Sequence, residues 1–465
     1  ATMTTTATSA TRATRNQYSS GMARALSRLN AWMDSRPLID YTMVRTIVLV
    51  LAGLGVVMVT SSSMTWSVLS DESVWAQPLK QAIVVAMGLF AFWVALQIPP
   101  ERIRNIAALF MGLSILLLVL VLIPGIGTGR DEVGSQSWIY IAGFQLQPSE
   151  IARVAICVWG ASILANKDPR KMFQLTNGFM PFIIVSVLCM GLIGAQGDLG
   201  MMVSFSIVVA FILLFAGVTW KFIGIVAGFA AVLLVAVMAA GGYRSHRLLV
   251  YFDALFGHFE DTRGVAFQSY QGFLSLADGS LFGVGLGQSR AKWFYLPEAK
   301  NDFIFAVIGE ELGLWGGAVV IILFALLLFF GLRTARRAQN QFQALLAAAI
   351  TTGIVSQAFI NIGYVIGLLP VTGIQLPMIS AGGTSAVITL GAMGLVASVA
   401  RHEPDAVSAM QNYGRPLFDR MFFLAEPKAP RTPVRQAPRR VREAPAPTPV
   451  TARRRAQYTD TRRAS

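Results

Sequence analysis

The sequence predicts an all-α, polytopic membrane protein of about ten transmembrane helices, with a long extracytoplasmic loop between spans 7 and 8. Of the 465 residues, 54% are hydrophobic and 13% are charged, a balance that leaves a water-soluble globule with far too much apolar surface. The hydrophobic residues gather in runs long enough to cross a bilayer as helices. Lys and Arg fall in every second connection between the runs, as cytoplasmic loops do in membrane proteins.

Ten apolar runs are predicted to be spans, and those numbered four to six are the short ones. They are Val44–Ser61, Gln81–Gln97, Ile106–Ile123, Ile151–Ala165, Phe179–Ala195, Leu199–Gly217, Phe222–Ala240, Phe303–Leu332, Leu345–Ile366 and Ile379–Ala400. Arg28 and Arg36 precede the first run, which ends in three serines without a cleavage pattern, so we expect an uncleaved first span.

The basic connections set the predicted orientation. They contain Arg102 and Arg104, residues 167–171, Lys221, residues 333–337, and Arg401. Such loops stay in the cytoplasm, and an even number of spans then places both termini there. The formal net charge of +14 is therefore attributed to membrane topology, and no nucleic-acid partner is expected.

The composition divides the chain into a membrane domain and two tails. Residues 1–40 are predicted to be a disordered cytoplasmic tail with a short surface helix at Met22–Met33. Residues 41–400 form the ten-span domain, in which residues 241–301 are the large outer loop. Residues 401–465 form a basic, Pro/Arg-rich cytoplasmic tail that either touches anionic lipids or docks a protein. Cys157 and Cys189 lie in apolar runs, where neither a disulfide framework nor a zinc site is expected.

The first candidate cluster lies where the large loop enters the eighth span, in the segment from Tyr295 to Gly313. Carboxylates at such a boundary are costly unless they are used. Asp302 precedes Phe-Ile-Phe, and partial desolvation there makes a carboxylate a better base. The alternative, favoured by spacing alone, is that Asn301 or Asp302 caps the eighth helix.

The second cluster opens the fourth span with Gln147-Pro-Ser-Glu150-Ile-Ala-Arg153. Glu150 and Arg153 share one helical face, and the structural reading is an ion pair that neutralises two costly charges. Trp138, just upstream, is interpreted first as an interfacial anchor. Asp198 is interpreted first as a helix cap.

The third cluster is rich in Pro and Gly from Gly367 to Ser385. Such backbone is tolerated at membrane depth where it lines a cavity or packs in protein, so it indicates a site. Gln357 and Asn361, four residues apart just upstream, are predicted to pack against another helix through hydrogen bonds.

Together the clusters resemble the SEDS family of bacterial cell-wall polymerases, which contains the FtsW and RodA proteins. The resemblance runs from about Val44 to Ala400. It rests on Leu-Pro-Glu298 followed by Asp302-Phe-Ile-Phe-Ala and Gly309-Glu-Glu-Leu-Gly313, on Gln147-Pro-Ser-Glu150, and on Gly-Leu-Leu-Pro370 with Leu-Pro377 and Ser380-Ala-Gly-Gly-Thr-Ser385.

The sequence departs from the family pattern at three positions. Ser137 stands where many relatives carry Arg, Ala381 stands where Tyr is usual, and Arg153 replaces the Lys that pairs with Glu150. An arginine contact beside Trp138 therefore cannot be assumed. The segment from Gly373 to Ser385 is closer to FtsW of actinobacteria than to RodA, which predicts septal division.

The resemblance implies a peptidoglycan glycosyltransferase that polymerises lipid II on the outer face of the cytoplasmic membrane. The family's essential loop aspartate matches Asp302, which would be the general base with inversion at the anomeric carbon. Substrate-binding candidates are Glu150, Arg153, Trp138, Gln147, Arg244, Arg247, Lys292, Lys300, Ser380, Gly382, Gly383 and Ser385. No metal site of the protein is expected, because no outer carboxylates stand at metal-ligand spacing; a Mg or Mn ion would be held largely by the substrate pyrophosphate.

The resemblance also implies partners, namely a class B penicillin-binding transpeptidase and other division proteins. Two other functions stay open on the residues alone. One is a lipid II flippase, since broken helices also describe transporters, although no internal repeat is found. The other is a division scaffold without chemistry.

Overall fold

The computed structural model describes most of the membrane domain. The described residues are Arg24, 27–28, 30–69, 73, 75–130, 134–141, 144–171, 173–225, 228, 232, 265–290, 292, 296 and 298–427. The bundle helices among them are α2 (Ile39–Leu69), α3 (Ala76–Gln97), α4 (Pro100–Leu120), α6 (Pro148–Leu164), α7 (Phe179–Ala195), α8 (Leu199–Phe215), α12 (Ile304–Arg337), α13 (Gln341–Val365) and α14 (Thr384–Arg401).

These helices confirm the polytopic all-α fold, and a helix is present at nine of the ten predicted spans. Six helices of the described part are long and apolar enough to cross a bilayer, namely α2, α3, α4, α12, α13 and α14. Helices α6, α7 and α8 have 17 residues each, about 26 Å at 1.5 Å per residue, which matches the prediction of short spans. Most of the predicted seventh span, 222–240, lies outside the described residues.

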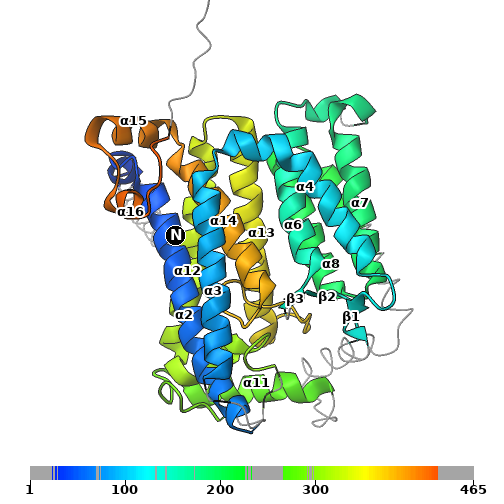
Figure 1. Ribbon diagram of the computed structural model, residues 1–465, viewed down its shortest axis with the longest axis vertical. Helices are drawn as coiled ribbons and strands as arrows, with labels where there is room; N and C mark the ends of the chain where they lie inside the picture. Colours follow the sequence, from blue (N-terminus) through cyan, green and yellow to red (C-terminus); the bar gives the residue numbers. More distant parts are fainter. Residues whose placement is uncertain are drawn as a thin grey trace, which may run out of the picture. The chain divides into compact units, whose positions relative to one another are not determined.

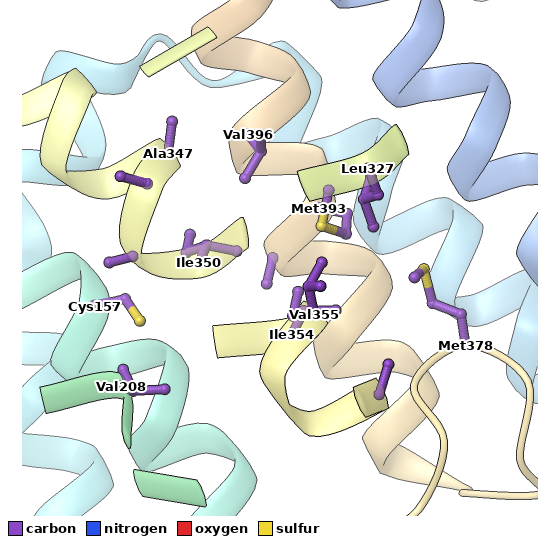
Figure 2. Close-up of a cluster of buried hydrophobic side chains, with 14 of the residues drawn as sticks. Cys157, Val208, Leu327, Ala347, Ile350, Ile354, Val355, Met378, Met393 and Val396 are labelled. Atoms are coloured by element: carbon purple, nitrogen blue, oxygen red, sulfur yellow. The ribbon is translucent and has the colours of Figure 1, made fainter. Parts of the chain in front are cut away.

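Helix α13 forms the centre of the bundle. Its apolar window is 83% buried, against 22% for that of α12. Figure 2 shows Ala347, Ile350 and Ile354 of α13 among side chains from the surrounding helices, including Val208 of α8 and Met393 of α14. Polar side chains on α13 are therefore held in the protein interior, away from lipid.

Close approach of α3 and α14 depends on glycine. A Cβ atom at Gly394 would lie 2.7 Å from both the Cβ of Ala95 and the carbonyl oxygen of Phe92. Small residues let helix backbones approach in membranes, where packing drives association. Replacing this glycine would push the two helices apart.

A small antiparallel sheet, β1-β2-β3, caps one end of the bundle. Strand β2 (Trp138–Ile141) pairs with β1 (Gly127–Thr128) and β3 (Phe144–Leu146), with Ile139 opposite Leu146. The predicted outer connection between spans 3 and 4 contained no strand. The difference arises because two to four residues of alternating pattern are too short to separate from a loop.

Helix α11 (Val265–Gly279) lies at the same end of the bundle as the sheet (Figure 1). It belongs to the predicted large loop, for which no helix was expected. We call this end the predicted outer end, because it carries the connections predicted to face outward, including Asp302.

Helix α12 is broken near its start. Gly313 has φ 69° and ψ −167°, a conformation essentially restricted to glycine. The break leaves two helix carbonyls without helical partners, and they accept hydrogen bonds from the loop after α11: Val284 N to Glu310 O at 2.9 Å and Gly285 N to Glu311 O at 3.0 Å. The loop is therefore built into the helix.

The opposite end, predicted to be cytoplasmic, carries α15 (Pro404–Tyr413) and α16 (Leu417–Met421) (Figure 1). The sequence analysis expected only a basic tail after Arg401, and the two helices form there because Ala406, Val407 and Met410 of α15 are buried; residues beyond 427 lie outside the described part. Residues 30–34 are helical, in agreement with the predicted surface helix. Arg333 and Arg337 pair with Asp34 at 2.6 and 2.8 Å.

Candidate active site

Asp302 lies in the turn that leads into α12. The amides of Asn301 and Phe303 both donate to the carbonyl of Glu298, at 3.0 and 3.2 Å, so the chain folds back just before the helix. The N-cap position is Phe303, and no side-chain hydrogen bond is made from it. The N-cap position therefore lies at Phe303, after the two residues predicted to supply the cap. The Asn301 side chain donates to the Glu298 carboxylate.

Three consecutive carbonyls of this turn accept hydrogen bonds from residues 361–381. Lys300 O accepts from Ala381 N at 3.0 Å, and Asn301 O accepts from Ser380 Oγ at 2.7 Å. Asp302 O accepts from Asn361 Nδ2 at 2.9 Å and from Tyr364 OH at 3.0 Å. We call this set the carbonyl clamp. It fixes the backbone that carries the Asp302 side chain.

The same two α13 side chains hold the Pro/Gly-rich segment. The carbonyl of Ile374 lies 2.7 Å from Asn361 Nδ2 and 2.6 Å from Tyr364 OH. A Cβ atom added to Gly373, where φ is +74°, would lie 3.7 Å from Asp302 Oδ2. The carboxylate therefore faces the glycine backbone of the broken segment.

Spacing on α13 explains why one helix organises both loops. Gln357, Asn361 and Tyr364 recur at i, i+4 and i+7 and so lie on one face. All three are essentially buried. The predicted packing role of Gln357 and Asn361 is borne out as hydrogen bonding, but their partners are mostly loop backbone groups. Tyr364 was missed, because a tyrosine late in an apolar run has no distinctive spacing.

Arg153 forms the centre of a second buried network. Its guanidinium lies 2.6 Å from the Glu150 carboxylate and donates to Ser204 Oγ at 3.1 Å and to Gln357 Oε1. Gln357 Nε2 in turn donates to Gln375 O at 2.9 Å. The predicted ion pair is present, and it is connected through α13 to the Pro/Gly-rich segment.

Asp198 caps α8, as the sequence predicts. Its Oδ1 accepts from Met201 N at 3.0 Å, and its Oδ2 accepts from Gln147 Nε2 at 2.9 Å. Burial raises the pKa of the Asp198 carboxyl, and these hydrogen bonds oppose the rise. Gln147 thus joins the start of α6 to the start of α8.

The candidate residues after Pro377 shape the backbone. Ser380 Oγ accepts from Leu376 N at 2.8 Å while donating to Asn301 O. A Cβ atom at Gly382 would lie 2.4 Å from Gln375 Oε1. Gly383 is the N-cap of α14 with φ 47°, and the Ser385 amide donates to Gly382 O. Their predicted contacts with substrate stay predictions.

Trp138 lies on β2, half-buried, opposite Thr128. A Cβ atom at Gly129 would lie 2.6 Å from its ring, so the indole packs across that glycine. The anchoring role of Trp138 and its role in substrate binding both stay predictions.

Two buried carboxylates tie the outer loop to α12. Glu310 accepts from Ser289 Oγ and Arg290 N, each at 2.6 Å. Glu311 accepts from Ser61 Oγ at 2.7 Å and lies 3.5 Å from Lys292 Nζ. The sequence analysis assigned these glutamates no role, although paired carboxylates inside an apolar run signal one.

The basic candidates differ in access. Lys292 is 5% exposed; it donates a hydrogen bond to Gly287 O and also contacts the Glu311 carboxylate. Arg153 is buried as well. Lys300 is half-buried in the turn of the carbonyl clamp. Arg244 and Arg247 lie outside the described residues.

Within the described part of the chain, no three His, Cys, Asp or Glu side chains come together as metal ligands. What the site offers is one carboxylate on a fixed backbone, beside glycine-rich loops, at one end of the bundle.

A family model described as "Cell cycle protein", that of the FtsW, RodA and SpoVE proteins, matches residues 41–405. The chain belongs to this family. It is accordingly an integral membrane glycosyltransferase of the cell-division group. The matched residues run from near the start of α2 to beyond α14 and include all the candidate site residues.

Individual proteins of this family are also similar in sequence to this chain. The chain is 41% identical over 393 residues to "Probable peptidoglycan glycosyltransferase FtsW" of Mycobacterium tuberculosis, covering 84% of this chain and 73% of that one. It is 36% identical over 361 residues to "Stage V sporulation protein E" of Bacillus subtilis, covering 77% and 95%.

Solved structures share the fold. A chain from the structure titled "Structural coordination of polymerization and crosslinking by a peptidoglycan synthase complex" has a TM-score of 0.60 at 22% identity and covers 77% of this chain and 97% of that one. The rod shape determining protein RodA of Thermus thermophilus has a TM-score of 0.55 at 23% identity, covering 77% and 96%. These likenesses confirm the polytopic architecture.

Proposed function

We propose that this chain polymerises lipid II into peptidoglycan glycan strands at the outer face of the cytoplasmic membrane during septal division. The observation that carries the proposal is the carbonyl clamp, which holds Asp302 on rigid backbone at one end of the bundle. A base must be positioned within hydrogen-bonding reach of the proton it removes, and fixed backbone provides that positioning. The family membership and the names of the relatives support the same activity.

In this reaction Asp302 acts as general base. Its carboxylate takes the proton of the acceptor 4-hydroxyl while that oxygen forms a bond to the donor's anomeric carbon. The bond from the anomeric carbon to the pyrophosphate oxygen breaks, and the lipid pyrophosphate leaves with the electron pair. Attack from the face opposite the leaving group inverts the anomeric centre. General base catalysis contributes roughly 10²- to 10⁴-fold to such a step.

The leaving pyrophosphate requires fixed positive charge. Of the described candidates, Lys300 is the best placed, because it is half-buried and lies two residues before Asp302. Arg153 and Lys292 are buried and pair with Glu150 and Glu311, so we infer that they position the surrounding loops. Arg244 and Arg247 keep the role inferred for them from the sequence.

The proposal includes partners and place. A class B penicillin-binding transpeptidase would crosslink the strands, in keeping with the structural relative whose title joins polymerisation and crosslinking. The protein would sit in the cytoplasmic membrane at the septum with both termini in the cytoplasm, where the basic tail would meet anionic lipids or other division proteins.

The test is glycan-strand formation from purified lipid II by the full chain with its transpeptidase partner. We expect polymer from the wild type and a loss of roughly 10²- to 10⁴-fold in rate for Asp302→Ala at equal folded yield. Asp278→Ala is the matched control, because Asp278 is an exposed carboxylate of α11 at the same end. Polymer from Asp302→Ala at the wild-type rate would remove Asp302 from the mechanism. No polymer from the wild type would instead favour transport or scaffolding.

A further inference from the structure

Large apolar side chains are exposed at the predicted cytoplasmic end, around α16. Leu417 is 67% exposed, Met421 63% and Phe423 84%, and Phe422 is also exposed. Together we call these four residues the α16 patch. Solvent-exposed apolar patches of this kind mark a surface that meets another molecule or a membrane.

The contacts of α16 place it beside the helix ends of the bundle. Tyr41 OH of α2 donates to Asp419 Oδ1 at 2.7 Å, and the Arg45 guanidinium lies 4.2 Å from the centre of the Phe418 ring. Trp93 Nε1 of α3 donates to Phe422 O at 2.9 Å. All three bundle residues belong to the apolar spans Ile39–Ser63 and Ala76–Gln97.

These contacts place the α16 patch beside α2 and α3 at a short distance from their ends. Arg45 is six residues inside the start of α2, and Trp93 is four residues before the end of α3. At 1.5 Å per residue, the contacts lie about 9 Å and about 6 Å inside the helix ends. Interfacial helices bury their apolar face about 5–10 Å into the boundary between headgroups and acyl chains.

The α16 patch also continues a lipid-facing surface. Phe90 of α3 is 64% exposed and stacks on Trp93, with 5.6 Å between ring centroids. Trp93 is the residue that bonds to Phe422, so the patch extends the exposed apolar face of α3. Because the exposed apolar face of α3 must contact lipid, a patch that continues this face is also expected to contact lipid.

Polar contacts hold the patch outward. Arg401 donates to Asp419 at 2.7 Å and to Ala425 O at 2.5 Å, and Arg415 donates to Leu424 O at 2.8 Å. Phe423 has φ +54°, a left-handed conformation that is costly for an aromatic residue. The surrounding hydrogen bonds maintain that conformation and keep the Phe423 ring exposed.

We propose that the α16 patch is a membrane anchor, which inserts Leu417, Met421, Phe422 and Phe423 into the leaflet at this end of the bundle. Exposed Arg420, next to Met421, lies at headgroup level and favours anionic lipids. This inference is independent of the catalytic proposal.

Spin labels on the full-length protein in phosphatidylcholine nanodiscs test the anchor. A label at Phe423→Cys should be more accessible to oxygen than to a water-soluble nickel complex, and a label at Gln411→Cys, an exposed position of α15, should show the opposite. Native Cys157 and Cys189 are buried, which limits background labelling. Leu417→Cys provides a second reporter should the first substitution disturb the turn.

Two outcomes would overturn the proposal. Nickel accessibility at 423 and 417 equal to that at 411 would show a patch in water. Protection from both reagents would show a patch covered by protein, either a second copy or another part of the chain. Replacing half of the lipid with phosphatidylglycerol should increase the immersion of the label at 423, and Arg420→Gln should abolish that increase. If phosphatidylglycerol left the immersion of the label unchanged in the protein that retains Arg420, Arg420 would have no part in the anchor.

Discussion

The hydroxyl of Tyr364 lies 3.0 Å from the carbonyl oxygen of Asp302 and 2.6 Å from that of Ile374. One buried side chain of α13 thus joins the turn that carries the proposed base to the Pro/Gly-rich segment that the base faces. Asn361 makes the same two connections. The position of the Asp302 carboxylate is therefore set by a helix about sixty residues further along the chain.

Tyr364→Phe should lower kcat on the order of tenfold with little change in KM. The substitution removes one hydrogen-bonding group from two buried carbonyls, which costs about 1 kcal/mol of stability. It leaves the carboxylate free to shift, and misplacement by about 1 Å costs up to about 10²-fold in rate. Polymerisation rates at several lipid II concentrations separate kcat from KM.

Tyr140→Phe is the control for this substitution, because Tyr140 is 61% exposed on β2 at the same end of the protein. Its rate and melting temperature should equal those of the wild type. If Tyr364→Phe retained the wild-type kcat at full folded yield, the hydroxyl would have no part in positioning Asp302.

Arg153→Met should destabilise the protein by about 3–5 kcal/mol, because it leaves the Glu150 carboxylate buried without its cation. The double variant Glu150→Leu/Arg153→Met should recover part of this loss, since neither charge remains. Arg153→Lys keeps the charge but loses the planar fork that reaches Ser204 and Gln357. We expect that variant to be intermediate in thermal unfolding.

Glu101→Gln is the comparison for this series, because Glu101 is an exposed carboxylate that accepts a hydrogen bond from Asn340 at 2.7 Å. Surface pairs contribute about 0–1 kcal/mol, so its melting temperature should change little. A double variant less stable than Arg153→Met would mean that Glu150 does not depend on Arg153.

Hydrophobic runs predicted most of the bundle from the sequence. The predicted fifth span, Phe179–Ala195, coincides with α7, and the predicted end of the second span, Gln97, is the end of α3. Such agreement follows because a lipid-spanning helix needs continuous apolar sequence and satisfies its own backbone hydrogen bonds. The burial of α13 was not predictable, since lipid and protein interior are equally apolar.

The carbonyl clamp could not be predicted, because it joins backbone carbonyls to hydrogen-bond donors that are far away in sequence. Ser380 and Asn301 are joined across the Pro/Gly-rich segment and the loop turn, and no spacing rule links such residues. The candidate residues were easier to find: the boundary position made Asp302 a candidate, and the family resemblance made it the proposed base. What positions it became visible only in three dimensions.

Gly313→Ala should destabilise the protein and loosen the outer loop. A Cβ atom there would lie 2.4 Å from Gly283 N, and φ of 69° with ψ of −167° is unsuited to alanine. Restoring a regular helix would also return the carbonyls of Glu310 and Glu311 to helical hydrogen bonds, so that they would no longer accept from the amides of Val284 and Gly285. Faster hydrogen exchange in residues 280–290, with a lower melting temperature, is the expected result.

Gly191→Ala is its counterpart in α7, where nothing lies within 4 Å of the added atom. Alanine has a higher helix propensity than glycine by about 1 kcal/mol, so this variant should be as stable as the wild type or more so. Equal exchange rates in Gly313→Ala and the wild type would mean that the break does not hold the loop.

Glu403, at the predicted cytoplasmic end, should make stability depend on pH. Burial raises the pKa of its carboxyl from 4.5 to about 8; neighbouring Asp40 adds to the rise and Arg337 opposes it. Between these two values the folded state keeps a proton that the unfolded state releases, so stability falls as pH rises from about 4.5 to about 8 and levels off above.

Glu403→Gln keeps the neutral form at every pH. Its melting temperature should match that of the wild type near pH 4.5 and exceed it increasingly up to about pH 8, whereas Glu426→Gln, at an exposed position, should show no such divergence. A difference between Glu403→Gln and the wild type that stayed constant with pH would mean that Glu403 is ionised in the folded protein, as its 3.4 Å contact with Arg337 alone would favour.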